Sequence, residues 1–375
     1  MGRDAATLEE AVQKAQAGDI VLLPEGKFVL ARELVIDRAL TLRGAGRDKT
    51  HVISTAANFG IQFTGQGPWT VENIQFTHTG NAPADVLLVS SGALAMNECG
   101  ITGGKKDETS PNRGHGLNVQ QADAISVNNC VVKGVDFIGI LIVGQERGQY
   151  TITSCSVENC ERGIVISSGK FQITKCAVEK CRDVGIQIRG ETTTGQVEGS
   201  IIRGNGSHGV EVSGRARAGL HKNQAIANAL HGLAVYGEAD VNMEGNVCTG
   251  NGHFGIEYHI DAKGLCRDNT CTQNRVGIGL GMRTTARVQN NVCKQNKIHG
   301  IWVRESATPI IEKNSCLGNG VSGIACIGQC SPTIAANRCM GNHQYGIHIG
   351  DSARPKIAKD NILTPNGAGP INRAP

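Results

Sequence analysis

Aromatic residues and long hydrophobic runs are both scarce in this sequence, and their scarcity limits its partners. Phe, Trp and Tyr make up 3% of its 375 residues, which leaves few rings on which nucleic-acid bases stack. The net charge is only +4, without the clustered basic residues that bind a phosphate backbone. No apolar run approaches the roughly 18 residues of a membrane span, and the residues after Met1 do not resemble a signal peptide. We therefore expect neither nucleic acid nor membrane as a partner.

Proline is also rare, with 10 residues, whereas glycine is abundant, with 50. A Gly-apolar-x-apolar pattern recurs every 22 to 24 residues through most of the chain. So constant a period over so long a stretch indicates one structural unit stacked on itself. The pattern begins at Gly116, Gly139, Gly163, Gly185, Gly209, Gly232, Gly255, Gly277, Gly300, Gly323 and Gly346.

Each repeat opens with alternating apolar and polar residues, as in residues 300–304 (GIWVR). Such alternation predicts a strand with one buried face, and no repeat contains a helical period of useful length. We expect three short strands in each repeat of about 23 residues. The sequence therefore predicts an all-β solenoid of parallel strands, in which each coil rises by about 4.8 Å, the spacing of neighbouring strands.

Equivalent positions of successive repeats carry the same residue types. Two columns pass from Cys to Asn along the chain, and a third, apolar column contains five consecutive cysteines before Leu363. Stacked Asn amides can donate and accept along the solenoid axis and so satisfy the bent backbone of a turn. We therefore predict that the Asn columns are structural and bind no substrate. Their Asn members are Asn223, Asn246, Asn269, Asn291, Asn314, Asn337 and Asn361, and Asn205, Asn228, Asn251, Asn274, Asn296, Asn319, Asn342 and Asn366.

Three stretches carry a family resemblance: residues 40–46 (LTLRGAG), 306–311 (SATPII) and 352–357 (SARPKI). With the repeats around them, they resemble right-handed parallel β-helix proteins of the pectate-lyase-like class, including carbohydrate-binding and sugar-hydrolase β-helices. The later coils are most similar to the β-helices of F-box-type adaptors and their bacterial relatives. The resemblance implies a right-handed parallel β-helix, but it says little about function because one fold hosts many activities.

We predict that residues 1–375 form one domain, because a solenoid lengthens without dividing. A capping-box pattern at Thr7 opens an N-terminal helix, which would cover the bare end of the first coil. No lid is recognisable at the C-terminal end, where we expect the tail, a removed domain or a second subunit. The predicted parts are a cap helix (1–19), irregular first coils (20–115) with a loop insertion (102–115), regular coils (116–366) and a tail without strand pattern (367–375).

The 14 cysteines mostly occupy the stacked columns, where an inward thiol behaves as a small hydrophobic group. Stacked thiols would crosslink haphazardly in an oxidising compartment, so we expect reduced cysteines and a cytoplasmic location. Four thiols on adjacent repeats would suit zinc, but their columns continue as Ser and Asn, which favours packing. They are Cys155, Cys160, Cys176 and Cys181. We expect no cofactor, and calcium only if the chain is a lyase.

The outward positions of the first strand of each repeat form the candidate functional surface. In the polysaccharide-active β-helices that the chain resembles, the cleft lies on this face. Its lower part is apolar, at Leu141, Val143 and Val165, and is either a contact patch or covered by the insertion. Its upper part mixes aromatic and hydrogen-bonding groups, which suit a sugar or peptide. We therefore predict a recognition or scaffold module that binds an elongated glycan or peptide through Arg189, Tyr236, His259, Trp302, Arg304 and His348.

The alternative is an enzyme at the same surface: a uronate-polysaccharide lyase, a C5-epimerase or a glycoside hydrolase. Glu211 and Glu257 lie two coils apart, about 9.6 Å at the strand spacing, which is near the range of an inverting carboxylate pair. Tyr236 lies between them, and His259 and Arg304 would act as base and charge neutraliser. The simpler interpretation is that these five residues are ordinary solvated surface.

Motifs of the sugar-active enzymes are mostly missing. Residues 114–116 (GHG) match the Gly-His-Gly of polygalacturonases, but the acidic motifs that would accompany it are absent. Four histidines directly precede the glycine that starts a repeat, a position that Phe254 and Tyr345 also occupy. We therefore expect these histidines to pack in turns rather than to catalyse. They are His115, His208, His231 and His299.

Overall fold

The computed structural model describes residues 7–107, 113–350 and 352–373. The chain divides into two compact units: unit 1 comprises Met1–Arg182 with Thr192–Thr194, and unit 2 comprises Asp183–Glu191 with Gly195–Pro375. The single domain expected over residues 1–375 remains a prediction. The ends of the predicted cap and tail, and the centre of the insertion at 108–112, lie outside the described residues.

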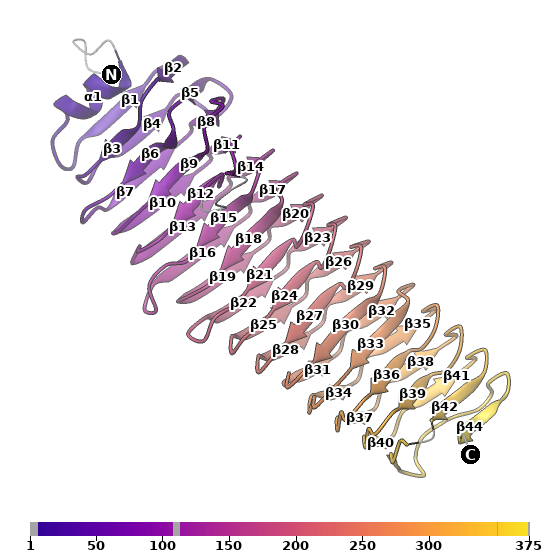
Figure 1. The fold of residues 1–375 in the computed structure, drawn as a ribbon. Helices are drawn as coiled ribbons and strands as arrows, with labels where there is room; N and C mark the ends of the chain where they lie inside the picture. The colour runs from indigo at the N-terminus through magenta and orange to yellow at the C-terminus, as the bar shows by residue number, and fades with distance from the viewer. Residues whose placement is uncertain (1–6, 108–112, 351, 374–375) are drawn as a thin grey trace. The chain divides into compact units, whose positions relative to one another are not determined.

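Unit 1 consists of three parallel sheets, each of which takes one strand from every coil (Figure 1). Sheet 1A contains β1 (Ile20–Leu23), β4 (Thr41–Gly44), β7 (Trp69–Glu72), β10 (Ala93–Asn97), β13 (Ala124–Asn128), β16 (Gln149–Thr153) and β19 (Lys170–Thr174). Sheet 1B contains β2 (Gly26–Leu30), β5 (Thr50–Ser54), β8 (Gln75–His78), β11 (Gly100–Thr102), β14 (Val131–Lys133), β17 (Ser156–Glu158) and β20 (Ala177–Glu179). Sheet 1C contains β3 (Leu34–Ile36), β6 (Asn58–Phe63), β9 (Ala84–Val89), β12 (Leu117–Val119), β15 (Ile138–Ile142) and β18 (Arg162–Ile166).

Unit 2 repeats this arrangement with shorter and more regular coils (Figure 1). Sheet 2A contains β22 (Thr194–Glu198), β25 (Arg217–His221), β28 (Asp240–Glu244), β31 (Leu265–Arg267), β34 (Arg287–Gln289), β37 (Ile310–Glu312), β40 (Thr333–Ala335) and β43 (Lys356–Ile357). Sheet 2B contains β23 (Ile201–Arg203), β26 (Gln224–Ile226), β29 (Val247–Thr249), β32 (Thr270–Thr272), β35 (Val292–Lys294), β38 (Ser315–Leu317) and β41 (Arg338–Met340). Sheet 2C contains β21 (Ile186–Ile188), β24 (Val210–Val212), β27 (Leu233–Tyr236), β30 (Phe254–His259), β33 (Val276–Leu280), β36 (Ile301–Arg304), β39 (Ile324–Ile327), β42 (Tyr345–Ile349) and β44 (Gly369–Arg373). The predicted all-β solenoid with three strands per coil is therefore confirmed.

The predicted N-terminal helix forms α1 (Leu8–Lys14), and the Thr7 hydroxyl accepts the Glu10 backbone N–H at 3.2 Å. Its Leu8 and Val12 side chains are buried, so the amphipathic face covers the first coil as expected. The helix ends earlier than predicted because Ala15 is already extended. Among the described residues, no helix is long and apolar enough to cross a membrane.

The core of each coil follows from alternation along the strands. On β30, for example, Ile256 and Tyr258 point inward and are fully buried. The glycine at the start of the strand is required by close approach between coils. A Cβ on Gly255 would lie 2.7 Å from the Gly277 carbonyl oxygen and 2.8 Å from the Asn274 amide nitrogen, well inside van der Waals contact. This crowding explains why glycine marks the repeat.

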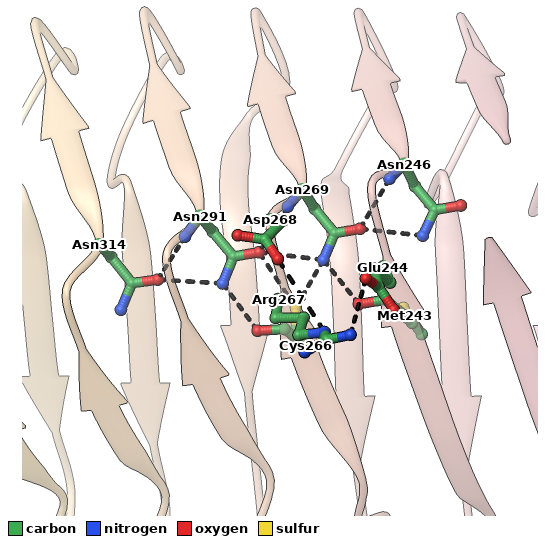
Figure 2. Close-up of polar contacts among 9 residues, drawn as sticks. All are labelled: Met243, Glu244, Asn246, Cys266, Arg267, Asp268, Asn269, Asn291 and Asn314. Carbon is green, nitrogen blue, oxygen red and sulfur yellow. Dashed lines mark hydrogen bonds and ion pairs between the residues drawn. The ribbon is translucent and has the colours of Figure 1, made fainter. Parts of the chain in front are cut away.

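The Asn columns of unit 2 form the predicted ladders, as Figure 2 shows for one of them. The Asn269 side-chain oxygen accepts both the backbone and the side-chain N–H of Asn246, each at 2.9 Å. Asn269 makes the same two bonds to Asn291 and donates to the Met243 carbonyl at 3.0 Å. Each buried amide is thereby satisfied by the coils on either side, and the predicted structural role is supported.

In unit 1, cysteines occupy the ladder position and bond to backbone carbonyls at the turn. The Cys155 thiol donates to the carbonyls of Val127, at 3.4 Å, and Thr153, at 3.3 Å. Other ladder cysteines of the unit make equivalent pairs of bonds, as Cys99 does to Val71 and Asn97. A thiol is a weak donor and lacks the amide oxygen, so this column holds its turns less firmly than the Asn ladders do.

The tail differs from the prediction. Residues 369–373 form β44, which pairs in parallel with β42, so that Ile347 lies beside Ile371. The two residues are one repeat apart, but the repeat signal was hidden because Pro370 interrupts the alternation. The expectation of a tail without a strand is therefore wrong for the described residues.

The insertion of unit 1 is anchored where it is described. Lys105 pairs with Ala84 through two backbone hydrogen bonds of 2.9 Å, and the Asp85 carboxylate accepts the backbone N–H groups of Gly114 and His115. Two residues of the predicted apolar patch are covered, because Leu141 is 9% and Val165 0% exposed. Its third residue, Val143, is exposed.

Replacing Asn269 by Ala should destabilise unit 2. The change leaves the backbone N–H and one side-chain N–H of Asn246 without an acceptor, and each buried unpaired group costs about 1–3 kcal/mol. We expect a loss of roughly 3 kcal/mol in the free energy of unfolding, measured by urea denaturation. Gln224→Ala, which removes an exposed side-chain amide on β26, should change it by less than about 0.5 kcal/mol. Equal effects of the two substitutions would contradict the ladder as a source of stability.

All 14 cysteines are free and buried. In the native protein, thiol-reactive probes should therefore label few of them within minutes, whereas the protein unfolded in guanidinium should label at all 14 positions. Mass spectrometry under denaturing, non-reducing conditions measures both states. Native disulfides in protein purified without reductant would refute the free-thiol assignment.

Candidate functional site

The outward residues of sheet 2C meet in the predicted column. Strand register places Glu211 beside Ala234, Ala234 beside Glu257, and Glu257 beside Gly279. The column continues from Gly279 to Trp302. The register predicted from the repeat is thus confirmed, and it brings most of the predicted site residues onto one face of unit 2.

Glu257 is the centre of this face, and it is not a solvated surface residue, since it is 3% exposed. One carboxylate oxygen accepts hydrogen bonds from His231 Nε2 at 2.9 Å and from the Tyr236 hydroxyl at 3.2 Å. The other oxygen pairs with the Arg304 guanidinium. Three side chains therefore converge on one carboxylate: His231 and Tyr236 from the coil before it, and Arg304 from two coils after it.

Two glycines make the pairing with Arg304 possible, because Arg304 lies two coils from Glu257. Gly279 and Gly281 occupy the outward positions of the coil between them. A Cβ on Gly281 would lie 2.9 Å from Arg304 Nε and 2.4 Å from a carbon of the His259 ring. A side chain there would block the path, so the bare coil lets the guanidinium cross to the carboxylate.

His231 was predicted to pack in a turn, and it does so, but it also takes part in this cluster. Its Nδ1 accepts the backbone N–H of Phe254 at 3.1 Å, so the ring proton must be on Nε2, which donates to Glu257. This arrangement assigns His231 as a neutral donor. The signal in the sequence was its position one coil before Glu257 and directly before the strand, which the repeat register makes adjacent.

A layer of rings lies over the same strands. His208 stacks on His231 with centroids 4.7 Å apart, and His231 contacts His253 at 5.1 Å. The Arg304 guanidinium lies over the rings of Phe254, at 5.1 Å, and Trp302, at 5.5 Å, both within the range of a cation–π contact. We call this surface the aromatic face; its rings are His208, His231, Tyr236, His253, Phe254, His259, His299 and Trp302.

Several polar atoms under the aromatic face have no partner. Trp302 Nε1 and the Nδ1 atoms of His208 and His299 are buried without a hydrogen bond. Buried polar groups are normally paired, and leaving one unpaired costs free energy. The rings are therefore held by packing more than by hydrogen bonds, in contrast to the ladders behind them.

Ionisation at the centre follows from these contacts. Burial alone would raise the pKa of Glu257, but the hydrogen bond from His231 and the charge of Arg304 outweigh it and lower this pKa below its usual value. Burial, together with the charge of Glu257, raises the pKa of Tyr236. Glu257 is thus a carboxylate and Tyr236 a neutral phenol at neutral pH, so Glu257 does not fit the general-acid role of an inverting carboxylate pair.

The other predicted site residues lie further from this centre. Glu211 accepts a hydrogen bond from Gln187 at 2.9 Å and does not share the partners of Glu257. His259 lies 3.4 Å from Glu305 and packs edge-on to Tyr236. Arg189 is exposed just after β21. His348 contacts Asn372 of β44 at 3.1 Å, so it belongs to a separate part of sheet 2C.

Unit 1 contains a second buried pair that the sequence placed in a turn. His115 Nδ1 lies 2.8 Å from the Asp85 carboxylate, which also accepts the Asn118 amide at 2.7 Å. Both residues are nearly inaccessible, and the His115 ring packs against Phe137. This cluster anchors the insertion. Among the described residues of the chain, no group of three or more His, Cys, Asp or Glu is arranged to hold a metal ion.

The stability of unit 2 should fall as pH decreases from about 6.5 to 4. Burial lowers the pKa of His208 and of His299 from 6.5 to about 4, so in this window the unfolded chain binds protons that the folded chain excludes. At about 1.4 kcal/mol per pKa unit, the loss is roughly 3 kcal/mol for each histidine. Urea denaturation at several pH values measures it.

His299→Gln should flatten this dependence, whereas His343→Gln, at an exposed position, should leave it unchanged. An equal pH slope in wild type and His299→Gln would contradict the burial of a neutral His299.

Comparison with solved structures places this geometry in context. The catalytic unit of a GH87 α-1,3-glucanase from Streptomyces thermodiastaticus strain HF3-3 is similar, with a TM-score of 0.54 and 12% identity over 96% of this chain. The chain spans only 64% of the length of that glucanase unit. The A-module of the mannuronan C-5 epimerase AlgE6 from Azotobacter vinelandii has a TM-score of 0.51 and 12% identity, over 97% of this chain and 93% of the module. At these identities the likeness concerns the fold alone.

No curated protein sequence matches this chain. A family model described as the right handed beta helix region matches residues 85–246 and 217–363, which together cover most of the sequence. The handedness expected from the resemblance is thereby confirmed. The chain belongs to the right-handed β-helix family.

Proposed function

We propose that unit 2 is a recognition module that binds a polysaccharide chain on its aromatic face. The observation that carries the proposal is the layer of rings over β24, β27, β30 and β36, in which Tyr236, His253, His259 and Trp302 are only partly buried. Sugar rings present an apolar C–H face and a rim of hydroxyl groups. Aromatic rings with polar edges match both.

The repetition of equivalent positions along the face supports an elongated ligand. Equivalent positions recur in coil after coil at about 4.8 Å, so a polymer that runs along the stacking direction meets a series of related contacts. The structural neighbours support a polysaccharide in particular, because the glucanase and the epimerase are both named for polysaccharide substrates. A peptide ligand is the other outcome of the test below.

Binding is favoured over catalysis by the state of Glu257. A general acid requires a proton at working pH, whereas the lowered pKa of Glu257 keeps it ionised. Both of its oxygens are also occupied by protein donors. In this proposal Glu257 holds Tyr236 and Arg304 in place, and the ligand contacts the rings.

An enzyme is the second candidate, since the similar structures are a hydrolase and an epimerase. Its residues would be Glu211, Tyr236, Glu257, His259 and Arg304. Incubation with pectate, alginate and α-1,3-glucan separates the two proposals. Unsaturated products that absorb in the ultraviolet, or new reducing ends, that disappear in Glu257→Gln would overturn the binding-only proposal.

We also propose that the protein functions in a reducing compartment such as the cytoplasm. Free thiols stacked in register support this, as in the pairing of Cys271 with Cys293.

Trp302→Ala and His259→Ala should each weaken oligosaccharide binding at least tenfold, because each removes a ring of the aromatic face. Isothermal titration with gluco- and manno-oligosaccharides measures the affinity. Leu317→Ala, on the outward side of β38 in sheet 2B, is the matched control and should bind as wild type does. If wild-type protein binds peptides from a display library but none of the glycans, the proposal of a polysaccharide ligand is wrong.

A further inference from the structure

The charge of Arg304, the cation at the centre of the aromatic face, is already compensated. Its guanidinium pairs with Glu257, and the two side chains are 19% and 4% exposed. Salt and water screen such a partly buried pair much less than an exposed one. An anionic ligand would therefore find no free positive charge at this point.

Glu257 is also unable to move aside. Its second oxygen is bound to His231 and Tyr236, and His231 is fixed in turn by the backbone N–H of Phe254. An incoming carboxylate that competed for Arg304 would leave Glu257 buried without its cation, held only by His231 and Tyr236, and the loss of one partner of a buried ion pair is strongly unfavourable.

The remaining acidic groups near the face act in the same direction. Glu305 lies 3.4 Å from His259 on one side, and Glu211 lies two coils from Glu257 on the other. A carboxylate or sulfate placed over Tyr236 and Trp302, at the centre of the face, would thus approach three carboxylates and one compensated cation. Arg275, exposed beside His253 at the edge of the face, is a further cation, and Arg275→Gln tests whether it attracts an acidic ligand. Arg189, the other basic residue of the predicted set, is exposed beyond β21 and two coils from Tyr236.

We infer that the aromatic face selects uncharged glycans over acidic ones and that Glu257 determines this selectivity. The inference rests on the proposed function. It assigns hydroxyl groups of neutral sugars as the partners of the ring edges, and it gives Glu257 a specificity role without contact to the ligand.

The test compares α-1,3-gluco-oligosaccharides with mannuronate oligosaccharides of the same length by isothermal titration. Wild-type protein should bind the neutral probe at least tenfold more tightly, with an affinity that changes less than twofold between 50 and 300 mM NaCl. Glu257→Gln keeps the shape of the side chain but removes its charge. This variant should bind the acidic probe at least tenfold more tightly than wild type does, and that gain should weaken with salt.

Two further variants control the result. Adding Arg304→Gln to Glu257→Gln should abolish the gain, because the released cation is gone. Glu238→Gln removes an exposed carboxylate that pairs with Arg215 and should leave both affinities unchanged. If Glu257→Gln does not fold, as circular dichroism would reveal, the wild-type preference and its salt dependence still decide the question.

The outcomes separate the two proposals. Wild-type protein that prefers the acidic probe, through Arg304 or through Arg189 as judged by Arg189→Gln, overturns the selectivity and leaves polysaccharide recognition intact. Wild-type protein that binds neither probe nor other glycans overturns both. A neutral preference that persists unchanged in folded Glu257→Gln overturns the role of Glu257.

Discussion

Unit 2 depends on hydrogen bonds between asparagine side chains that stack from coil to coil in two ladders. A turn between strands leaves backbone N–H groups without a sheet partner, and burial makes each of them costly. In the ladders, one side-chain oxygen accepts a backbone N–H and a side-chain N–H from the coil before it, as Asn269 does for Asn246. Because every amide is both acceptor and donor, the vertical register of the coils is specified at each step.

This firm inner frame permits an outer face that is less well satisfied. Behind sheet 2C the amides are paired, whereas in front of it Trp302 Nε1 and one imidazole nitrogen each of His208, His259 and His299 lack hydrogen bonds. Functional sites commonly carry such local cost, which the surrounding structure must offset. Here the free energy that offsets this cost comes from the Asn ladders, whose hydrogen bonds hold the coils in place and do not involve the aromatic rings.

The repeat made the fold and the column register predictable, because one period fixes which residues are neighbours. The candidate site was only partly predictable. Tyr236, Glu257 and Arg304 do meet on one face, but periodicity says nothing of how far a side chain reaches. The burial of Glu257 depends on His231, which belongs to a turn, and on the missing side chain of Gly281. A glycine that matters because it has no side chain is hard to recognise from a sequence pattern.

The bare coil at Gly279 and Gly281 also limits how this protein can change in length. Repeat proteins gain and lose whole coils readily, since a ladder rejoins wherever a complete period is removed. Loss of the glycine coil would bring Trp302 directly above Glu257, and gain of a coil would carry Arg304 out of reach of it. Between β30 and β36 the count of one coil is held by an ion pair, and a coil inserted between β27 and β30 would likewise separate Glu257 from His231 and Tyr236.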